Sequence, residues 1–563
     1  MSIFGRNLEA LKRRFPHIAA DVEGSDAEAS SLVETARSGE PTLRLCSPDG
    51  PGPYLHSRID PRRDGRRRGD EVSPKVGYLV VWGPGLFYEI EYLLERPALA
   101  LVVAIEPSEG MIRAALSARD IAHLLRNPRL HLLVGTSAEA SEAARYVKST
   151  YVPVLHGAFR VEPARPRADE ARQTTDAVRS AATGQLEDVS IQRRFGLRWF
   201  SNAVRNLLAA ESPPVHLPVR PEMVVAAAGP SLEESAALLH GSLPVISTDT
   251  ALPVLLQRGI RPVAVVSLDC QQVSYHHLLV GGTEARDVPL AADLSSPPTV
   301  LRHVRRAVLT AGGHPFTHLV QEQLTGIISI DGSGGNVTQA AVSFATKLGA
   351  RRVFLVGADL SYPQGRPYAR DCYVYPYFRS RETRLEPAHA QLWDMVLADP
   401  QTKGEPQHED GTARTYRTPK LDMYRERLAE YVSGLDAEVV FEPPPARARV
   451  SQTGTREFTR ADRTLRRAVL EAVAEELEEL VLPSQPSGTH GEAAPANRAD
   501  PGSWAEADGG FAALSRRQQA LWYALIPSAA AFLEGDLDVR NASRVLLHAR
   551  QWAVGVIRGA LER

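Results

Sequence analysis

The sequence has few cysteines and no long apolar run, and each absence narrows the classes of protein it can encode. Its 563 residues include three cysteines, Cys46, Cys270 and Cys372, which lie far apart and form no CxxC pair. This spacing argues against a disulfide framework or a zinc knot and favours a reducing compartment. No stretch reaches the ~18–20 uncharged apolar residues that cross a bilayer, and the N-terminus lacks the apolar core of a secretory signal. The expected location is therefore the cytoplasm, without membrane attachment.

The chain also lacks an excess of charge of either sign. It has 65 Lys and Arg residues against 67 Asp and Glu, a formal net charge of −2, so the whole chain has no general attraction to nucleic acid or anionic membranes. Arginine is far commoner than lysine, which supplies planar guanidinium groups suited to phosphates and carboxylates. The composition, 43% hydrophobic and 23% charged, is that of a globular protein. A chain of this length is expected to form about three to four domains.

The N-terminal part has the pattern of a βαβ unit. After a short leading helix, residues 76–82 form a continuous apolar strand that ends at the turn Gly83-Pro84-Gly85. A helical pattern and a second apolar strand follow, and Glu106 stands at the end of that strand. In Rossmann-like folds, turn glycines let a ligand approach the helix, and a carboxylate after the second strand meets a ribose hydroxyl. The turn lacks the full GxGxxG spacing, so a ligand site and a purely structural unit both remain open.

Four further segments of the N-terminal half carry weaker patterns. Residues 58–72 are dense in charge and have no apolar periodicity, which predicts an exposed loop, either a solvated linker or a phosphate-steering patch. Residues 130–134 and 151–154 are expected to add strands to the small sheet. Residues 195–208 have apolar side chains at helical spacing, which predicts a connecting helix.

In the central part, successive strands end in glycine, hydroxyl or acidic residues. Residues 223–228, 243–246 and 261–266 have buried-strand patterns, and a helical pattern follows at least the first two. The residues of interest at these strand ends are Gly229, Pro230, Ser231, Thr248, Asp249 and Asp269. In an open parallel sheet, ligands bind at the carboxyl edge, so these strand ends are expected to converge on one nucleotide-type site.

A second cluster lies between residues 331 and 362. The turn 331–337 is rich in small residues and precedes a helix at 338–348, which offers free backbone N–H groups beside Ser333, Gly334 and Asn336. The next strand pattern, residues 352–356, is followed by Asp359 and Tyr362. These residues are expected to extend the same edge of the sheet.

These motifs, taken in order, resemble one family. The set GPSL, STDTALP, SLD, GSGGNVTQAA and FLVGADLSY resembles the motility-associated factor (Maf) flagellin glycosyltransferases over about residues 220–435. The leading helix and VWGPGLFYEIEYLLE extend the resemblance toward the N-terminus. The central domain of that family is similar to bacterial sialyltransferases, which use a cytidine-monophosphate (CMP) sugar without a metal, and to archaeal 6-hydroxymethylpterin pyrophosphokinases of the MptE-like type.

The resemblance implies an α/β fold with three parts. These are a Rossmann-like N-terminal domain, a central doubly wound sialyltransferase-like (GT-A-like) domain and a C-terminal helical region. The expected boundaries are 1–165, a helical connector at 166–220, 221–440 and 441–563, with a disordered Pro/Gly-rich linker at 483–503.

The activity implied is transfer of a nonulosonic acid, such as pseudaminic or legionaminic acid, from its CMP form to Ser or Thr hydroxyls of flagellin. This reaction supports flagellum assembly and motility. The partners implied are flagellin and the CMP sugar, and a homo-oligomer is possible. No cofactor is expected, although carboxylates at the edge could hold magnesium around a diphosphate. A pterin pyrophosphokinase and a non-catalytic flagellin-binding module remain alternatives.

The resemblance also assigns roles to residues. Gly229, Pro230 and Ser231 would touch the donor phosphate or ribose, Thr248 and Asp249 would line the nucleotide pocket, and Asp269 would lie on the sugar side. Ser333, Gly334 and Asn336 would hold the leaving group, and Asp359 with Tyr362 would complete the edge. One departure is that the sialyltransferases carry an asparagine in the first glycine loop, where this chain has alanines at 226–228.

The acceptor hydroxyl must lose a proton, which calls for a histidine or carboxylate as general base. The candidates are Asp269, Asp359, and His408 or Asp410 in a polar loop. That loop belongs to the long tyrosine-rich segment 363–418, which is expected either to cover a substrate or to pack on a neighbouring domain or subunit. The pair His276-His277 is expected on an exposed helix surface. His314 and His318 have no acidic partner at ligand spacing, so no metal site is predicted.

Overall fold

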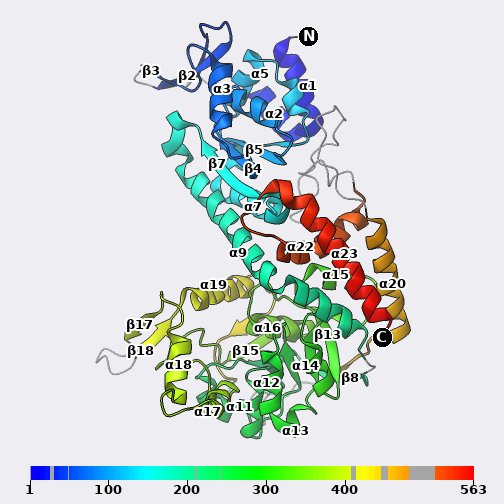
Figure 1. Cartoon of the computed structure of the whole chain (residues 1–563). Helices are drawn as coiled ribbons and strands as arrows, with labels where there is room; N and C mark the ends of the chain where they lie inside the picture. The colour runs from blue at the N-terminus through cyan, green and yellow to red at the C-terminus, as the bar shows by residue number, and fades with distance from the viewer. Residues whose placement is uncertain are drawn as a thin grey trace. The chain divides into compact units, whose positions relative to one another are not determined.

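The computed structural model describes residues 2–25, 31–47, 50–209, 212–240, 243–406, 414–444, 454–480 and 514–563. The chain divides into two compact units, Met1–Gly196 with Glu479–Trp552 and Leu197–Glu478 with Ala553–Arg563. Each unit contains a parallel sheet flanked by helices (Figure 1), so the α/β fold class is confirmed. Among the described residues, no helix is both long and apolar enough to cross a membrane.

The first unit is built on a four-stranded parallel sheet of order β6-β5-β4-β7. Its strands are β4 (Val76–Trp82), β5 (Leu101–Glu106), β6 (Leu130–Val134) and β7 (Ala158–Pro163). All of β4 and β5 is buried, as expected for parallel strands covered on both faces. The strand predicted at 151–154 is wrong, because Pro153 begins the short helix α8 (Pro153–His156). Proline has no N–H to donate to a ladder, but its fixed φ suits the first helical position.

Helices α1 (Ile3–Arg14), α2 (Pro16–Gly24) and α5 (Glu109–Ala118) form one layer of this unit. The predicted leading helix is confirmed, and its apolar residues Leu8 and Leu11 are buried together with Phe15. Asn7 ties α1 to the end of α5, because its side-chain amide donates to the carbonyls of Leu116 and Arg119. A separate antiparallel sheet contains β1 (Ser31–Thr35), β2 (Pro41–Ser47) and β3 (Gly50–Tyr54).

The predicted exposed loop at 58–72 is wrong, because residues Pro61–Asp70 form helix α3. Asp60 caps its N-terminus by accepting from the Arg63 N–H, and its buried face consists of Pro61, Gly65 and Gly69. This face packs on α4 (Tyr88–Leu94), where Gly65 lies against the backbone of Tyr88. The helix therefore buries itself through small residues at i, i+4 and i+8 rather than through an apolar stripe.

This packing predicts opposite effects for two glycine-to-alanine changes in helices. A Cβ at Gly65 would lie 2.8 Å from the Tyr88 carbonyl carbon and 2.9 Å from the Glu89 nitrogen, so Gly65→Ala is expected to destabilise the protein by about 1–3 kcal/mol. Gly184, in α9 (Ala168–Leu207), has nothing within 4 Å of its added Cβ. Gly184→Ala is therefore expected to stabilise by about 0.5–1 kcal/mol through helix propensity alone. Denaturant unfolding of both variants tests the contrast, and equal shifts would contradict it.

The second unit is built on an eight-stranded parallel sheet of order β14-β13-β12-β11-β10-β9-β15-β19. Its strands are β9 (Glu222–Ala226), β10 (Val245–Thr248), β11 (Ala264–Ser267), β12 (Leu290–Asp293), β13 (Ala307–Ala311), β14 (Ile327–Ser329), β15 (Arg352–Val356) and β19 (Glu438–Val440). The chain winds outward from β9 to β14 and then returns to place β15 beside β9, with Ala226 opposite Val356. The predicted doubly wound arrangement is confirmed.

Two layers of helices cover this sheet. One core cluster holds α16 (Val337–Lys347) and α19 (Pro419–Ser433), and the other holds α10 (Leu232–Ser235), α11 (Leu252–Gln257) and the start of α17 (Val374–Ser380). A small antiparallel sheet of β16 (Tyr362–Pro363), β18 (Arg414–Arg417) and β17 (Lys403–Pro406) lies in the segment that follows β15. This segment also carries α18 (Ala388–Val396) (Figure 1).

The C-terminal helices belong to different units. Helix α20 (Arg463–Glu479) lies almost wholly in the second unit, whereas α22 (Arg516–Ala531) lies in the first. Buried Arg466 fastens α20 to the end of α9, because its guanidinium donates to the carbonyls of Leu207 and Ala209. Helix α23 (Ala542–Leu561) follows, which confirms the helical prediction for this region. The predicted linker 483–503 lies outside the described residues.

Candidate functional site

The candidate site lies at the carboxyl edge of the eight-stranded sheet. Strands β9 and β15 are neighbours there, but the chain leaves them in opposite winding directions, which makes this pair the topological switch point. In open parallel sheets, ligands bind in the crevice outside such a point. The predicted residues of the first glycine loop follow β9, and Asp359 follows β15.

The structure brings the first glycine loop and Asp359 into contact. The Gly229 N–H donates to the Gly357 carbonyl over 2.7 Å. Ser231 donates to Asp359 Oδ2 through its backbone N–H over 3.2 Å and its hydroxyl over 2.8 Å. A Cβ on Gly229 would collide with that carboxylate, so only glycine allows the two loops to approach this closely. The N–H and the hydroxyl of Ser231 therefore both face a carboxylate oxygen. A phosphate of the sugar donor bound at this position would compete with Asp359 for these two hydrogen bonds.

The segment after β15 is fixed against this loop. Glu233 at the start of α10 pairs with Arg366 and Arg370 at 3.0 Å each and accepts from the Arg370 backbone N–H. Burial would raise the pKa of Glu233, but the hydrogen bonds from Arg370 and the charges of both guanidinium groups lower it overall. The Ala369 N–H also donates to the Ala228 carbonyl over 2.8 Å. Residues 366–370 therefore lie directly on the edge of the sheet, next to the loop after β9.

Tyr362 extends the edge from β16, where it pairs with Tyr416 of β18. Its side chain is partly buried, and this burial raises the pKa of its hydroxyl.

Thr248 ends β10 and Asp249 follows it, and both are almost completely buried, at 3% and 2% exposure. The Thr248 hydroxyl donates to the Ala226 carbonyl over 3.3 Å. Asp249 accepts from the Ser267 hydroxyl over 2.8 Å and from the Thr250 N–H over 2.7 Å. Burial would raise the pKa of Asp249, but the charge of His277 and the hydrogen bonds that Asp249 accepts lower this pKa overall. The group is therefore a carboxylate. Both predicted nucleotide-pocket residues are thus bonded within the protein.

A histidine missed by the sequence prediction lies beside Asp249. His276 is exposed as predicted, but the prediction is wrong for His277, which has only 8% of its surface exposed. It lies on α12 (Val273–Val280), the helix that follows β11. Its Nδ1 is 2.7 Å from the Thr250 hydroxyl, and its ring stacks on Tyr373 with 4.4 Å between the ring centres.

The glycine-rich turn after β14 is held by hydrogen bonds within the turn and to the first residues of α16. Asp331 accepts from the Ser333 N–H and hydroxyl over 2.8 and 2.6 Å, and from the Gln339 side chain over 3.1 Å. Asn336 caps α16, because its side-chain oxygen accepts from the Gln339 N–H. Gly334 is buried against the Gln339 side chain. The predicted set Ser333, Gly334 and Asn336 therefore forms one compact turn at the N-terminus of α16.

Helix α19 contacts both loops of the candidate site. Arg427 donates to the Ser333 carbonyl over 3.4 Å, and Arg425 donates to the Leu360 carbonyl over 2.8 Å. The ring of Tyr424 lies close to Gly335. Sequence analysis missed these residues and did not predict the helix that carries them. The two arginines place positive charge beside the loops after β14 and β15.

Aspartates close the turns at the ends of other strands. Asp269 accepts from the Gln271 N–H over 2.9 Å, and it has no hydrogen bond to Ser333 or Asp359 among the described residues. Asp293, which the sequence analysis did not single out, accepts from Ser295 and from the Gly312 N–H. The repeated Asp-x-Ser pattern at 293–295 and 331–333 was a usable signal, because aspartate readily bonds to the backbone two residues on.

The end of α9 covers part of this edge. Asn202 donates to the Ser295 carbonyl over 2.8 Å, and Asn206 donates to the carbonyls of Leu294 and Ser296 over 2.8 and 2.7 Å. Helix α9 therefore covers the loop after β12, whereas the switch point between β9 and β15 lies further along the sheet.

Two predicted base candidates, His408 and Asp410, lie outside the described residues. Within the described part of the chain, no group of three or more His, Cys, Asp or Glu side chains is arranged to hold a metal ion.

The N-terminal Gly83-Pro84-Gly85 turn is bonded internally. The Leu86 N–H, which follows the turn, donates to His56 Nε2 over 2.7 Å, and a Cβ on Gly85 would collide with the same ring. Glu106 does not face an open site, because Arg167 Nη1 contacts both of its carboxylate oxygens at 3.0 and 2.8 Å. These contacts favour the interpretation of this turn as a structural βαβ unit.

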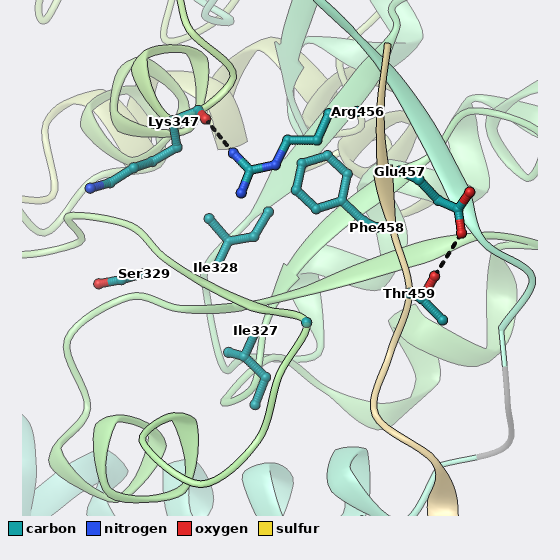
Figure 2. Close-up of a pocket in the computed structure, with 9 residues that line it drawn as sticks. Ile327, Ile328, Ser329, Lys347, Arg456, Glu457, Phe458 and Thr459 are labelled. Atoms are coloured by element: carbon teal, nitrogen blue, oxygen red, sulfur yellow. Dashed lines mark hydrogen bonds between the residues drawn. The ribbon is translucent and has the colours of Figure 1, made fainter.

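A pocket of about 470 Å³ lies elsewhere in the second unit. Residues 326–329 and 456–459 line it with Lys347 (Figure 2), and its floor carries Ile327, Ile328 and Phe458. Lys347 ends α16, whereas Asn336 caps the opposite end of that helix. An eleven-residue helix is about 16 Å long, so this pocket is separate from the candidate site at the carboxyl edge.

Comparison with known proteins confirms the predicted resemblance at the level of the fold. A solved structure of a MAf glycosyltransferase from Magnetospirillum magneticum AMB-1 covers 100% of this chain and 95% of that chain, with a TM-score of 0.57 and 15% identity. A model of the family "6-hydroxymethylpterin diphosphokinase MptE-like" matches residues 199–365.

Three uncharacterized proteins of Treponema pallidum (strain Nichols) are also similar. They share 31% identity over 127 residues, 29% over 173 and 26% over 196, which is 23%, 29% and 35% of this chain. These stretches make up 44%, 81% and 44% of the three relatives, so the chain spans less than half of the first.

Proposed function

We propose that this chain is a glycosyltransferase that moves a nonulosonic acid from a CMP-activated donor to Ser or Thr hydroxyls of flagellin. The observation that carries the proposal is that the fold likeness to the MAf glycosyltransferase extends over the whole chain, including the N-terminal unit and the C-terminal helices. A nucleotide-binding sheet alone would match only the central part. The motif set between residues 220 and 435 supports the same activity.

The chemistry of the edge suits a sugar monophosphate leaving group. Transfer from a nonulosonate passes through an oxocarbenium-like state in which negative charge builds up on the departing phosphate. Ser231 supplies a hydroxyl and an N–H at the switch point, and Arg425 and Arg427 place positive charge beside the two neighbouring loops. Preorganised donors and guanidinium groups are what such a leaving group needs. The expected site of this reaction is the cytoplasm.

The double variant Ser333→Ala with Asp269→Ala tests the proposal. We expect it to fold normally but to leave flagellin without the sugar, because it removes a hydroxyl beside the leaving group and a carboxylate on the sugar side. Intact-mass spectrometry of flagellin from cells that carry only this variant measures the result. The matched control is Ser433→Ala with Asp436→Ala, at exposed positions near the far end of α19. Flagellin of wild-type mass in the first variant would overturn the proposal.

The MptE-like match at 199–365 keeps a pterin pyrophosphokinase as the second candidate. Incubation with ATP, magnesium and 6-hydroxymethyl-dihydropterin distinguishes the two, because only the kinase releases AMP. A non-catalytic flagellin-binding module is the third candidate. It predicts that flagellin binding survives when Ser231, Ser333, Asp269 and Asp359 are all replaced, and that wild-type protein adds no sugar.

A further inference from the structure

His277, Thr250 and Asp249 form a hydrogen-bonded chain whose direction can be worked out. Thr250 Oγ lies 2.7 Å from His277 Nδ1 and 3.2 Å from Asp249 Oδ1, and Nδ1 itself is 3.5 Å from that carboxylate oxygen. A carboxylate only accepts, so the threonine hydroxyl must donate to Asp249 for this bond to form. The hydroxyl oxygen then accepts from Nδ1–H. The opposite direction would leave the lone pair of Nδ1 facing the negative oxygen.

In the neutral form of the ring, which is the form that can accept a proton, this direction fixes the state of the other nitrogen. In a neutral imidazole one nitrogen carries the proton and the other has a free lone pair. With the proton on Nδ1, the lone pair is on Nε2. That atom is buried and has no hydrogen-bond partner among the described residues. An unpaired buried acceptor is unfavourable, so a hydroxyl that donates to Nε2 would gain a bond that the protein itself does not supply.

Other buried histidines differ from His277 in this respect. His56 and His314 also have one buried ring nitrogen without a hydrogen-bond partner among the described residues. In each of them, however, the other nitrogen accepts a backbone N–H, from Leu86 and Phe316 respectively. The nitrogen without a partner therefore carries the proton and is no base. Burial lowers the pKa of both histidines to about 3, which keeps these rings neutral.

The position of His277 relates it to the candidate site. Its helix follows β11 and the turn that contains Asp269, and its partners Thr250 and Asp249 follow β10 at the carboxyl edge. Tyr373 belongs to the segment fixed on the first glycine loop, and its ring stacks on His277 with 17° between the planes. The Cys372 thiol beside it contacts the Thr250 carbonyl at 3.3 Å. The stacking on Tyr373 and the contact of Nδ1 with Thr250 therefore hold the imidazole in one orientation.

We infer that His277 is the general base of the proposed transfer, with Thr250 and Asp249 as positioning residues. The inference rests on the proposed function. His277 Nε2 takes the proton of the acceptor hydroxyl while the acceptor oxygen bonds to the anomeric carbon of the sugar. The bond from that carbon to the phosphate oxygen breaks, and its electron pair leaves with CMP. The carboxylate of Asp249 stabilises the imidazolium that forms, through the Thr250 hydroxyl and by its charge.

The test uses His277→Asn in the full-length protein, with CMP-nonulosonate and flagellin as substrates. An asparagine amide can still donate to Thr250 from the place of Nδ1–H, but it has no base in place of Nε2. We expect kcat to fall by about 10²–10⁴-fold, the range for general-base catalysis, while CMP binding by calorimetry stays within about 2-fold. His276→Asn, on the same helix but exposed, is the matched control and is expected to retain activity.

A second pair of variants separates catalysis from folding. Imidazole added to His277→Ala is expected to restore part of kcat, whereas a merely structural histidine would not be rescued in this way. Thr250→Val is expected to lower kcat with little change in KM, and Thr250→Ser is expected to restore it. A His277→Asn enzyme with wild-type kcat would overturn the inference and leave the proposed function standing. Wild-type protein that transfers no sugar from any CMP-nonulosonate would instead refute the proposed function itself.

Discussion

Replacement of Arg167 by methionine is expected to destabilise the first unit by about 3–5 kcal/mol, the cost of breaking a buried ion pair by removing one partner. Glu106 is 1% exposed, and Arg167 Nη1 contacts both of its oxygens. The guanidinium also lies 4.5 Å from the centre of the Trp82 ring. Methionine retains the apolar stem but leaves the buried carboxylate without its counter-ion. Denaturant unfolding followed by circular dichroism measures the change.

The double variant Glu106→Gln with Arg167→Met is the decisive comparison. Removing both charges is expected to recover most of the lost stability, because a buried pair contributes little net stability once neither charge remains. Arg179→Met, on helix α9 that begins just after Arg167, is the matched control. Arg179 pairs with Asp176 at an exposed position, and such pairs contribute about 0–1 kcal/mol. An Arg167→Met protein as stable as wild type would mean that Glu106 is not held by this pair.

The strands could be predicted from the sequence because of their environment. A strand covered on both faces has to be apolar at every position, so runs such as 76–82 and 352–356 are recognisable without any partner. The carboxyl edge could also be predicted, because parallel strands all end on the same side of a sheet. This argument located Ser231 and Asp359 at one edge. It could not show that they bond to each other, since the return of β15 to the side of β9 depends on the order of the strands.

Helix α3 could not be predicted, for a physical reason. Its buried face consists of a proline and two glycines, and α4 supplies the surface that packs on them: the backbone and Cβ of Tyr88 lie on Gly65, and the ring of Tyr92 lies on Gly69. Apolar periodicity detects helices that bury their own large side chains, so it fails where the neighbour supplies the apolar surface. A composition rich in arginine added to the error, because most of these side chains are exposed or paired with acidic residues such as Asp64.

The burial of His277 in the candidate site could not be predicted from the sequence either. The sequence places it on a helix after β11, but its burial depends on Thr250 from one loop and on Tyr373 from a segment far along the chain. A two-histidine run gives no sign of which residue points inward. The adjacent pair therefore divides into one exposed and one buried side chain only when the packing of α12 is known.

Gly229→Ala is expected to lower kcat/KM for sugar transfer by about 10²-fold or more, because small displacements of positioning groups have effects of this size. The added Cβ would collide with Asp359 Oδ2 and would lie 2.6 Å from the Gly357 carbonyl oxygen. The first glycine loop must therefore move away from the loop after β15, and Ser231 would lose its present geometry. Steady-state kinetics with CMP-nonulosonate, together with calorimetric CMP binding, measures the effect.

Stability distinguishes local displacement from unfolding. Overpacking of this kind typically costs about 1–3 kcal/mol, which a domain of this size tolerates, so Gly229→Ala is expected to remain folded at 25 °C. The matched control is Gly434→Ala at the end of α19, where an added Cβ makes only an ordinary contact of 3.6 Å with the Tyr431 carbonyl oxygen. Its kinetics are expected to equal those of the wild type. If Gly229→Ala instead retained full kcat/KM, the donor could not be held by the loop at the switch point, and the turn before α16 would have to bind it alone.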